Sequence, residues 1–376
     1  MLLLNSVAFV TSAESTLVLK GGSYLDVRAG VVRPNGAIVV RGGRILELHR
    51  PESAWRAPAD AQVVTLERRT ILPGLIDAHV HLTLSGEPAK NAAETLAAGF
   101  TTVVDLGSTQ GAAIRLRRRI AAGQVMGPTV IAAGSWIGAK GGVCEFGGAT
   151  VSTASEAGTR ARDDLQAGAD VLKICVTGWA AAAVTHPDSI ELKSGAVSAV
   201  LKVARVGGRP VYAHAIGQAG ALLAARRGVR ALAHTPVLET FGAAILKRTG
   251  TYVISTVSTV PAGAARDRVS ESLRLLHETG VPIVLGTDAG VLRHGDNARE
   301  LVALTEIGLS PMEALRAATV NAAALLERPS LGEIVAGANA DLVIVEGDPL
   351  QDIAVVRRPV LVIRGGTIVR QPGGSQ

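Results

Sequence analysis

LPGLIDAHVHL, residues 72–82, divides the chain into two styles of sequence. Before it, short alternating runs are separated by Gly-rich turns. After it, apolar runs that are typical of buried strands alternate with Ala-rich stretches that are typical of helices. Such alternation indicates βα units that build a parallel sheet. The stretch itself therefore reads as the first buried strand of this sheet, and it carries two histidines near its end.

Eight apolar runs with strand character follow one another in this second part. A series of eight parallel strands predicts a closed (β/α)8 barrel, whose catalytic groups lie on the loops after the strands. Two of these loops, 135–150 and 177–187, are expected to be long, and both are rich in Gly and Ala. The predicted strands are residues 75–81, 101–107, 128–134, 171–176, 211–215, 231–234, 251–256 and 282–287.

The two ends of the chain resemble each other. LVLKGG at 17–22 is nearly repeated by LVIRGG at 361–366, and ADLVIVEG at 340–347 has the same strand character. The N-terminal runs read as small antiparallel strands and hairpins. We therefore predict a small β-sandwich domain formed by residues 1–70 and 335–376, and a barrel domain formed by residues 71–334.

Composition narrows the class of protein. The chain has 376 residues, of which 48% are hydrophobic and only 3% aromatic, so a large aliphatic core is expected. The net charge of +6 is spread along the chain, and the one dense run, residues 115–119, suits the solvated face of a helix. We therefore expect neither a nucleic-acid partner nor a membrane partner.

Location and redox state follow from weaker signals. Cys144 and Cys175 form no CxxC pair, and Cys175 lies in an apolar run, so reduced thiols are expected. Residues 1–13 contain a short apolar patch ending in Ser-Ala but no basic residues before it. A cytoplasmic protein is expected, with secretion through a short N-terminal signal as the alternative.

Polar residues stand at the ends of several predicted strands. Two histidines separated by one residue in an extended strand point to the same face and can bind one metal ion. Each residue has a simpler interpretation alone, as a histidine satisfied by the core or a turn-capping aspartate. Five of them at the ends of the first, fifth, sixth and eighth predicted strands favour a metal site: His79, His81, His214, His234 and Asp288.

Lys173 stands in VLKICV, a run that is expected to be buried. An unpaired ammonium there would cost several kcal/mol or lose its proton. A neutral buried amine can add carbon dioxide and become a carbamate, and this anion is able to bridge two cations.

Together these motifs resemble the amidohydrolase superfamily. The resemblance rests on LPGLIDAHVHL, GADVLKICVTG (168–178), VYAHAIG (211–217), GTDAG (286–290) and ADLVIVEGDPL (340–350), and it extends over about residues 16–369. Within the superfamily, the chain is most similar to the branch of imidazolonepropionase-related enzymes, prolidase-type dipeptidases and N-acyl amino-acid carboxypeptidases. The resemblance implies that His79, His81 and Asp288 hold one divalent ion and that His214 and His234 hold a second. The two ions, expected to be zinc, are bridged by carboxylated Lys173, and the protein is expected to be a homo-oligomer.

The implied reaction is hydrolysis of a C–N bond. A hydroxide that bridges the two metals attacks the carbonyl of a small-molecule substrate, and Asp288 transfers the proton to the leaving nitrogen. A dipeptide or an N-acyl amino acid is the leading substrate. Cyclic amides, lactones and phosphotriesters are alternatives for the same site, and a non-catalytic metal-binding barrel is the alternative of another class.

Substrate contacts are less clearly indicated. RHGDNAREL (293–301) resembles a segment near the substrate in relatives, which makes His294 and Arg293 candidates. Tyr212 shares a strand face with His214, although packing in the core is the simpler interpretation. Trp136, Trp179 and His186 either shape the pocket or lie on the surface. The loop AKGGVCEFGG (139–148) lacks the histidine that related dipeptidases tend to have there.

Overall fold

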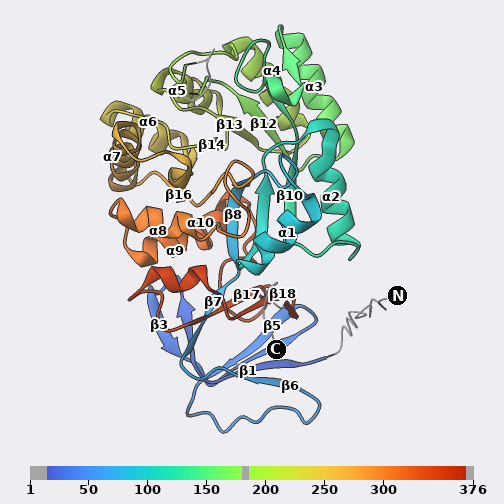
Figure 1. Cartoon of the computed structure of the whole chain (residues 1–376), viewed down its shortest axis with the longest axis vertical. Helices are drawn as coiled ribbons and strands as arrows, with labels where there is room; N and C mark the ends of the chain where they lie inside the picture. The colour runs from blue at the N-terminus through green and yellow to red at the C-terminus, as the bar shows by residue number, and fades with distance from the viewer. Residues whose placement is uncertain (1–14, 180–185, 370–376) are drawn as a thin grey trace.

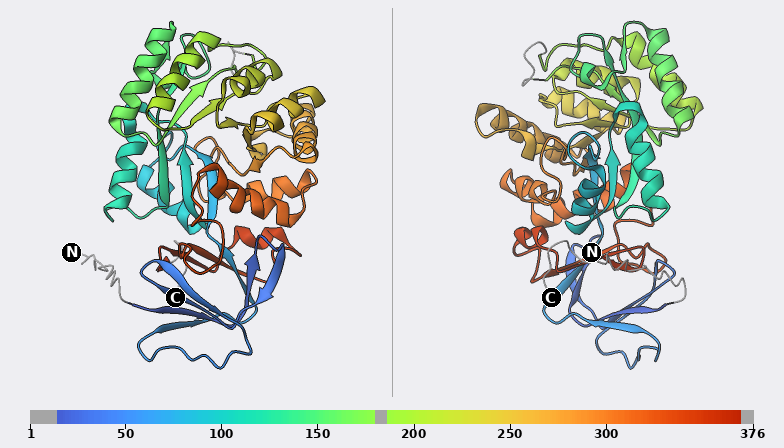
Figure 2. Two further views of the ribbon diagram at one scale, coloured as in Figure 1. Left: turned by 180° about the vertical axis from the view of Figure 1, so that it is seen from behind. Right: turned by 45° about the vertical axis from the view of Figure 1, so that its right-hand side comes forward.

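The computed structural model describes residues 15–179 and 186–369. Figure 1 shows two stacked parts, a large one of strands and helices and a smaller one made only of sheets, and Figure 2 shows the same arrangement from two further sides. The predicted N-terminal signal lies outside the described residues, as does the middle of the predicted loop at 177–187. No helix in the described residues is both long and apolar enough to cross a membrane.

The large part is an eight-stranded parallel barrel, as predicted. Its strands are hydrogen-bonded to their neighbours in chain order. The first and last strands meet through backbone bonds, since Ala78 N–H donates to the Leu285 carbonyl at 2.9 Å and Asp288 N–H to the His79 carbonyl at 2.7 Å. The strands are β8 (Leu75–Val80), β9 (Phe100–Asp105), β10 (Thr129–Ala139), β12 (Val171–Cys175), β13 (Val211–His214), β14 (Ala231–Ala233), β15 (Tyr252–Ile254) and β16 (Ile283–Val284).

Helices pack around this barrel (Figure 2). Helix α3 begins after Thr153 because Thr153 and Glu156 form a reciprocal capping box there. In α2 the predicted basic run lies as expected: Ile114 and Ile120 are buried, while Arg118 and Arg119 face solvent. The helices are α1 (Pro88–Ala97), α2 (Ala112–Ala121), α3 (Ala154–Ala167), α4 (Ser194–Val206), α5 (Gln218–Arg227), α6 (Thr240–Thr249), α7 (Ala264–Thr279), α8 (Arg299–Glu306), α9 (Pro311–Ala317) and α10 (Val320–Leu325).

The bounds predicted for the loop over 135–150 are wrong, because both ends of this segment form strands. Strand β10 continues to Ala139, and a short strand, β11 (Thr150–Val151), pairs parallel with it. Glycines in this extended strand permit close packing. A Cβ at Gly134 would lie 2.3 Å from the Asp164 side chain, and one at Gly138 would lie 2.9 Å from Cys144.

The prediction of two reduced cysteines is also wrong. Cys144 and Cys175 form a disulfide across a Cα–Cα distance of 6.3 Å. Both cysteines lie beside Gly138 in the extended part of β10, since a Cβ there would be 2.9 Å from Cys144 and 3.6 Å from Cys175. Disulfides persist mainly in oxidising compartments, so the bond does not favour the cytoplasmic location, which stays a prediction.

The small part contains two sheets built from both ends of the chain. One has the strand order β5-β4-β1-β6 and the other β19-β18-β17-β7-β2-β3. In the second sheet β7 pairs antiparallel with β17, which joins the N-terminal and C-terminal segments. The strands are β1 (Leu17–Lys20), β2 (Ser23–Asp26), β3 (Val31–Pro34), β4 (Ala37–Arg41), β5 (Arg44–His49), β6 (Gln62–Thr65), β7 (Arg69–Pro73), β17 (Leu342–Glu346), β18 (Leu361–Arg364) and β19 (Thr367–Val369).

These sheets confirm the β-sandwich beside the barrel, with one correction. The N-terminal strands are not all antiparallel, because β1 pairs parallel with β6 and β2 pairs parallel with β7. The two sheets share one apolar core that contains Leu19, Ile71 and Ile344. The predicted domain boundaries, after residue 70 and before residue 335, stay predictions.

Candidate metal centre

The six predicted ligands lie at the carboxyl ends of the barrel strands. His79 and His81 come from the end of β8, Lys173 from β12 and His214 from the last position of β13. His234 directly follows β14, and Asp288 follows β16. All are buried except His234, which is half-buried. The fold thus gathers side chains that lie more than 200 residues apart in the sequence.

Three of these residues have the geometry of a metal site. Asp288 Oδ1 lies 3.3 Å from His79 Nε2 and 3.2 Å from His81 Nε2, and the two Nε2 atoms lie 3.2 Å apart. One ligand atom from each residue falls within 4.8 Å of the others. The three side chains can therefore bind a single ion, and the predicted first ligand set is brought together.

His214 and His234 lie beside this triad. Their ring centroids are 4.7 Å apart, and the rings of His234 and His79 are 4.9 Å apart. Each ring has one nitrogen near a protein partner, since His214 Nε2 lies 3.4 Å from the Gly178 carbonyl and His234 Nδ1 lies 2.9 Å from Thr256 Oγ1. Such partners orient an imidazole and leave its other nitrogen as a ligand.

Lys173 completes the cluster and is its least conventional member. The side chain is 2% exposed, and Nζ has no hydrogen-bond partner among the described residues. Burial lowers the pKa of this amine to about 7. A buried amine without a partner costs free energy, so Lys173 does not stabilise the barrel through a hydrogen bond among the described residues.

The electrostatics of the cluster favour neutral imidazoles beside an ionised carboxylate. Burial lowers the pKa of His79 and His234 well below the usual value for histidine, and it lowers that of His214 to about 4. Burial alone would raise the pKa of Asp288, but the surrounding histidines hold it well below its usual range. Neutral imidazole nitrogens and a carboxylate are the donor set that divalent zinc prefers.

The backbone around the cluster is strained. His234, Thr256 and Asp288 have φ angles of 78°, 49° and 55°, which are uncommon for residues other than Gly. Strain of this kind persists where the surroundings impose it, and it concentrates at functional sites. The cluster is thus held in position by the barrel.

Comparison with known proteins agrees with this geometry. The model of the amidohydrolase family matches residues 70–369, which include the whole cluster and most of the chain. The chain belongs to the amidohydrolase family. As a member of this family it is a hydrolase, and the family generally uses divalent metal ions.

Individual relatives of this amidohydrolase are distant but extensive. Ochratoxinase from Aspergillus niger is 26% identical and matches 81% of this chain and 76% of its own length. Imidazolonepropionase from Anaeromyxobacter sp. (strain K) is 27% identical and matches 95% of this chain and 96% of its own. Among solved structures, a Xaa-Pro dipeptidase with bound methionine in the active site has a TM-score of 0.87. It is 28% identical and covers 95% of this chain and 100% of its own.

Two buried carboxylates of the amidohydrolase site were missed in the sequence. Asp77 accepts hydrogen bonds from His79 N–H and from the backbone and side chain of Thr287. Asp105 accepts one from Leu82 N–H, and burial raises its pKa to about 6. A signal was present for both, since each is the one acidic residue of a fully buried strand.

The three predicted substrate residues are dispersed. His294 is buried, with Nδ1 3.1 Å from Thr95 Oγ1, and burial lowers its pKa to about 4. Arg293 is exposed. Tyr212 packs in the core with Ala322 and Leu325 of α10, at the amino end of the barrel, and burial raises its pKa. The structure therefore does not bring Tyr212 to the cluster.

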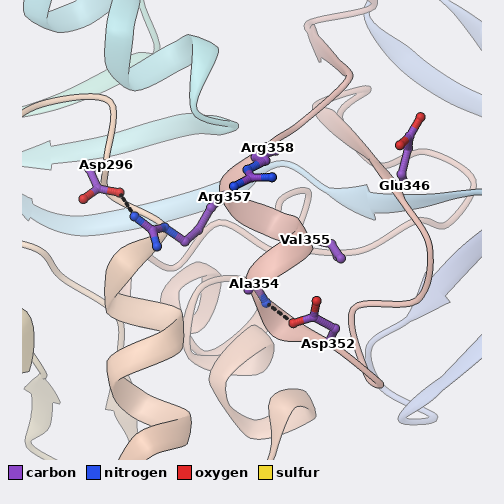
Figure 3. A pocket seen from close by; sticks show the side chains of 7 residues that line it. All are labelled: Asp296, Glu346, Asp352, Ala354, Val355, Arg357 and Arg358. Atoms are coloured by element: carbon purple, nitrogen blue, oxygen red, sulfur yellow. Dashed lines mark hydrogen bonds and ion pairs between the residues drawn. The ribbon is translucent and has the colours of Figure 1, made fainter.

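A separate pocket of about 500 Å³ lies outside the barrel mouth (Figure 3). It is formed by the residue before α8, the end of β17 and the 3-10 helix η4 (Ile353–Arg357), and it contains none of the six ligands. Arg357 pairs with Asp296 at 2.9 Å, and Asp352 accepts a hydrogen bond from Ala354 N–H. Because its lining includes none of the six candidate ligands, this pocket does not overlap the metal centre.

Proposed function

We propose that this amidohydrolase is a binuclear metal enzyme that cleaves the C–N bond of a small amide, either a dipeptide or an N-acyl amino acid. The observation that carries the proposal is the buried, unpartnered amine of Lys173 among four histidines and Asp288. The similarity to a Xaa-Pro dipeptidase structure and to ochratoxinase supports this substrate class over the lactones and phosphotriesters.

Each ligand has a place in the proposed site. His79, His81 and Asp288 would hold one divalent ion, and His214 and His234 would hold the second. Lys173 would add carbon dioxide, forming an N–C bond and releasing one proton, and the resulting carbamate would supply an anionic ligand for the two ions. Divalent ions held there, with zinc favoured by the histidine nitrogens, would lower the pKa of water toward neutrality and polarise the substrate carbonyl.

Asp288 is the residue that moves the proton. Its carboxylate is ionised because the histidines lower its pKa, so it can accept the proton of the attacking water. When the C–N bond breaks, the same group returns this proton to the leaving nitrogen. The products are a carboxylic acid and an amine, and Asp288 ends the cycle ionised.

Metal analysis beside a hydrolysis screen tests the proposal. Wild-type protein should bind two equivalents of zinc, and Lys173→Ala should lose zinc and activity together. Lys140→Ala, which removes an exposed lysine of a neighbouring loop, should change neither. Supplying ¹³C-bicarbonate should give a carbamate signal by NMR in wild type and none in Lys173→Ala.

The screen should cover dipeptides, N-acyl amino acids, cyclic amides, lactones and phosphotriesters. Hydrolysis confined to the amides supports the proposed bond. One equivalent of zinc or none, unchanged in Lys173→Ala, contradicts the binuclear site. Two equivalents of zinc without turnover of any substrate favour the non-catalytic barrel.

A further inference from the structure

We infer that the substrate carries a flat apolar ring beside the scissile bond and that Trp179 and Phe146 form the walls of its pocket. This inference rests on the proposed function and names its substrate class, an aromatic amide. The first observation is the distribution of aromatic residues. The chain has three Trp, three Tyr and four Phe residues, and two of the tryptophans contact histidines of the metal centre.

Trp179 lies on one side of the centre. Its ring centroid is 6.4 Å from that of His214 and 6.1 Å from that of His234. The side chain is half-buried, so part of the indole remains accessible beside two metal-binding histidines. A planar group bound at the centre can stack on this indole surface, whereas an aliphatic or charged group would make a weaker contact with it.

Trp136 and Phe146 lie on the other side. The ring of Trp136 is 5.4 Å from His81 and 5.0 Å from Phe146. Trp136 is only 3% exposed, whereas Phe146 is 61% exposed. Trp136 therefore acts as the support between the metal centre and Phe146, and Phe146 presents the accessible surface.

The support is rigid. A Cβ at Gly107 would lie 2.6 Å from the Trp136 ring, and one at Gly147 would lie 2.5 Å from it, so both glycines permit close packing on the indole. Trp136 also packs against both cysteines of the disulfide. Phe146 lies two residues after Cys144, so the disulfide limits the movement of this wall.

The rim of the barrel mouth is apolar as well. Four large apolar side chains that are at least 38% exposed stand on loops that follow barrel strands, namely Leu84, Phe146, Ile190 and Val291. Exposed apolar groups of this kind mark ligand-binding surfaces when they surround a few polar groups. Here they follow strands β8, β10, β12 and β16, and three of these strands carry or directly precede residues of the buried cluster.

Matched substrates and variants test the inference. Two pairs of substrates place a ring on either side of the scissile amide. The kcat/KM of wild type should be at least about tenfold higher for the ring-bearing member of one pair, either N-benzoylglycine over N-acetylglycine or N-acetylphenylalanine over N-acetylalanine. Trp179→Ala and Phe146→Ala should reduce this preference severalfold, and Trp179→Phe should keep most of it. Zinc content and thermal midpoint should stay at the wild-type values, which shows that the variants are folded.

The chain offers a control for each variant. Phe241 is 64% exposed and its ring lies 6.0 Å from the Arg226 guanidinium, so Phe241→Ala matches Phe146→Ala. Trp55 is half-buried and stacks on His49 in the small β part, so Trp55→Ala matches Trp179→Ala. Neither control should alter the preference for a ring.

Failure of the inference and failure of the proposed function give different results. Equal kcat/KM for ring and ring-free amides, unchanged in Trp179→Ala, overturns the inference while amide hydrolysis stands. If no amide is cleaved, calorimetric binding of N-benzoylglycine to zinc-loaded protein decides. Binding that weakens in Trp179→Ala but not in Trp55→Ala supports the aromatic pocket without the reaction, and no binding overturns it.

Discussion

Asn297 Nδ2 donates a hydrogen bond of 2.8 Å to the carboxylate of Asp77, which lies 220 positions earlier in the chain. Asp77 is fully buried between the first and last strands of the barrel and also accepts a bond of 2.6 Å from Thr287 Oγ1. His79 lies two residues after Asp77, and Asp288 directly follows Thr287. This carboxylate therefore links the two segments that carry His79 and Asp288, two members of the candidate metal site.

Exchanging the two side chains tests this link. In Asp77→Asn two amide groups face each other, so a donor meets a donor and a buried hydrogen bond is lost at a cost of about 1.5–3 kcal/mol. Zinc affinity should fall by about 10–100-fold, as for other groups that orient ligands. The double variant Asp77→Asn/Asn297→Asp should recover most of both losses. Zinc competition and urea unfolding measure them, with Asp352→Asn as a control remote from the site.

Additive losses in the double variant would contradict a direct pairing, because independent sites add and coupled ones do not. If the double variant recovers stability but not zinc affinity, Asp77 stabilises the fold and does not orient the metal ligands.

Asp288 should be needed for turnover beyond its part in binding metal. Asp288→Asn keeps the size of the side chain but cannot accept the proton, so kcat should fall by about 10²- to 10⁴-fold. Zinc content should be measured on the same samples, and kcat should be expressed per bound ion. A fall in activity that merely follows the loss of zinc would remove the proton-transfer role.

The sequence was sufficient to predict the barrel and to place the candidate ligands at the ends of its strands. Long aliphatic runs identify buried parallel strands, and a polar residue at the end of such a run has few structural reasons to be there. His214 after VYA and Asp288 after VLGT are examples. The alternation of side chains along a strand also predicted that His79 and His81 share one face. In the structure their Nε2 atoms are 3.2 Å apart.

Pairings between distant segments were not predictable in this way. The sequence around Asp77 does not indicate Asn297, because this contact depends on how the loop before α8 packs. The sequence around Cys144 does not indicate Cys175, because this contact depends on how β10 and the loop after it pack. Tyr212 shows a different limit. Alternation puts it on the same face as His214, but depth along the barrel decides its surroundings, and α10 closes the amino end over it.

His294 should make stability depend on pH. Burial lowers its pKa from 6.5 to about 4, so above pH 6.5 the imidazole is neutral in both the folded and unfolded states. Between pH 6.5 and 4 the unfolded chain binds a proton that the folded protein excludes. The free energy of unfolding should therefore fall over this range, by at most about 3 kcal/mol from this residue.

Urea unfolding at pH 7.5 and pH 5, with chelator present so that metal release adds nothing, measures the effect. His294→Gln should lose less stability on acidification than wild type. His186→Gln removes a histidine whose side chain is 68% exposed and should behave as wild type does. Equal acid sensitivity of wild type and His294→Gln would show that other groups cause it.

The disulfide should stabilise both the fold and the aromatic wall. It joins residues 31 positions apart, and closing a loop of this length lowers the entropy of the unfolded chain by an amount worth about 3–4 kcal/mol in the chain-entropy model. Dithiothreitol should therefore lower the urea midpoint of wild type. The variant Cys144→Ser/Cys175→Ser should start at this lower midpoint and not respond to the reductant.

Reduction should also lower the preference for aromatic amides, because Cys144 anchors the loop that carries Phe146. The turnover of N-acetylglycine should change less, because Lys173 stays in β12. Thiol titration of the unfolded protein provides the direct check. No free thiol before reduction and two after it are expected, since the chain has two cysteines. Two free thiols without reductant would mean that the bond does not form in the isolated protein, and Trp136 would then have to hold the wall by packing alone.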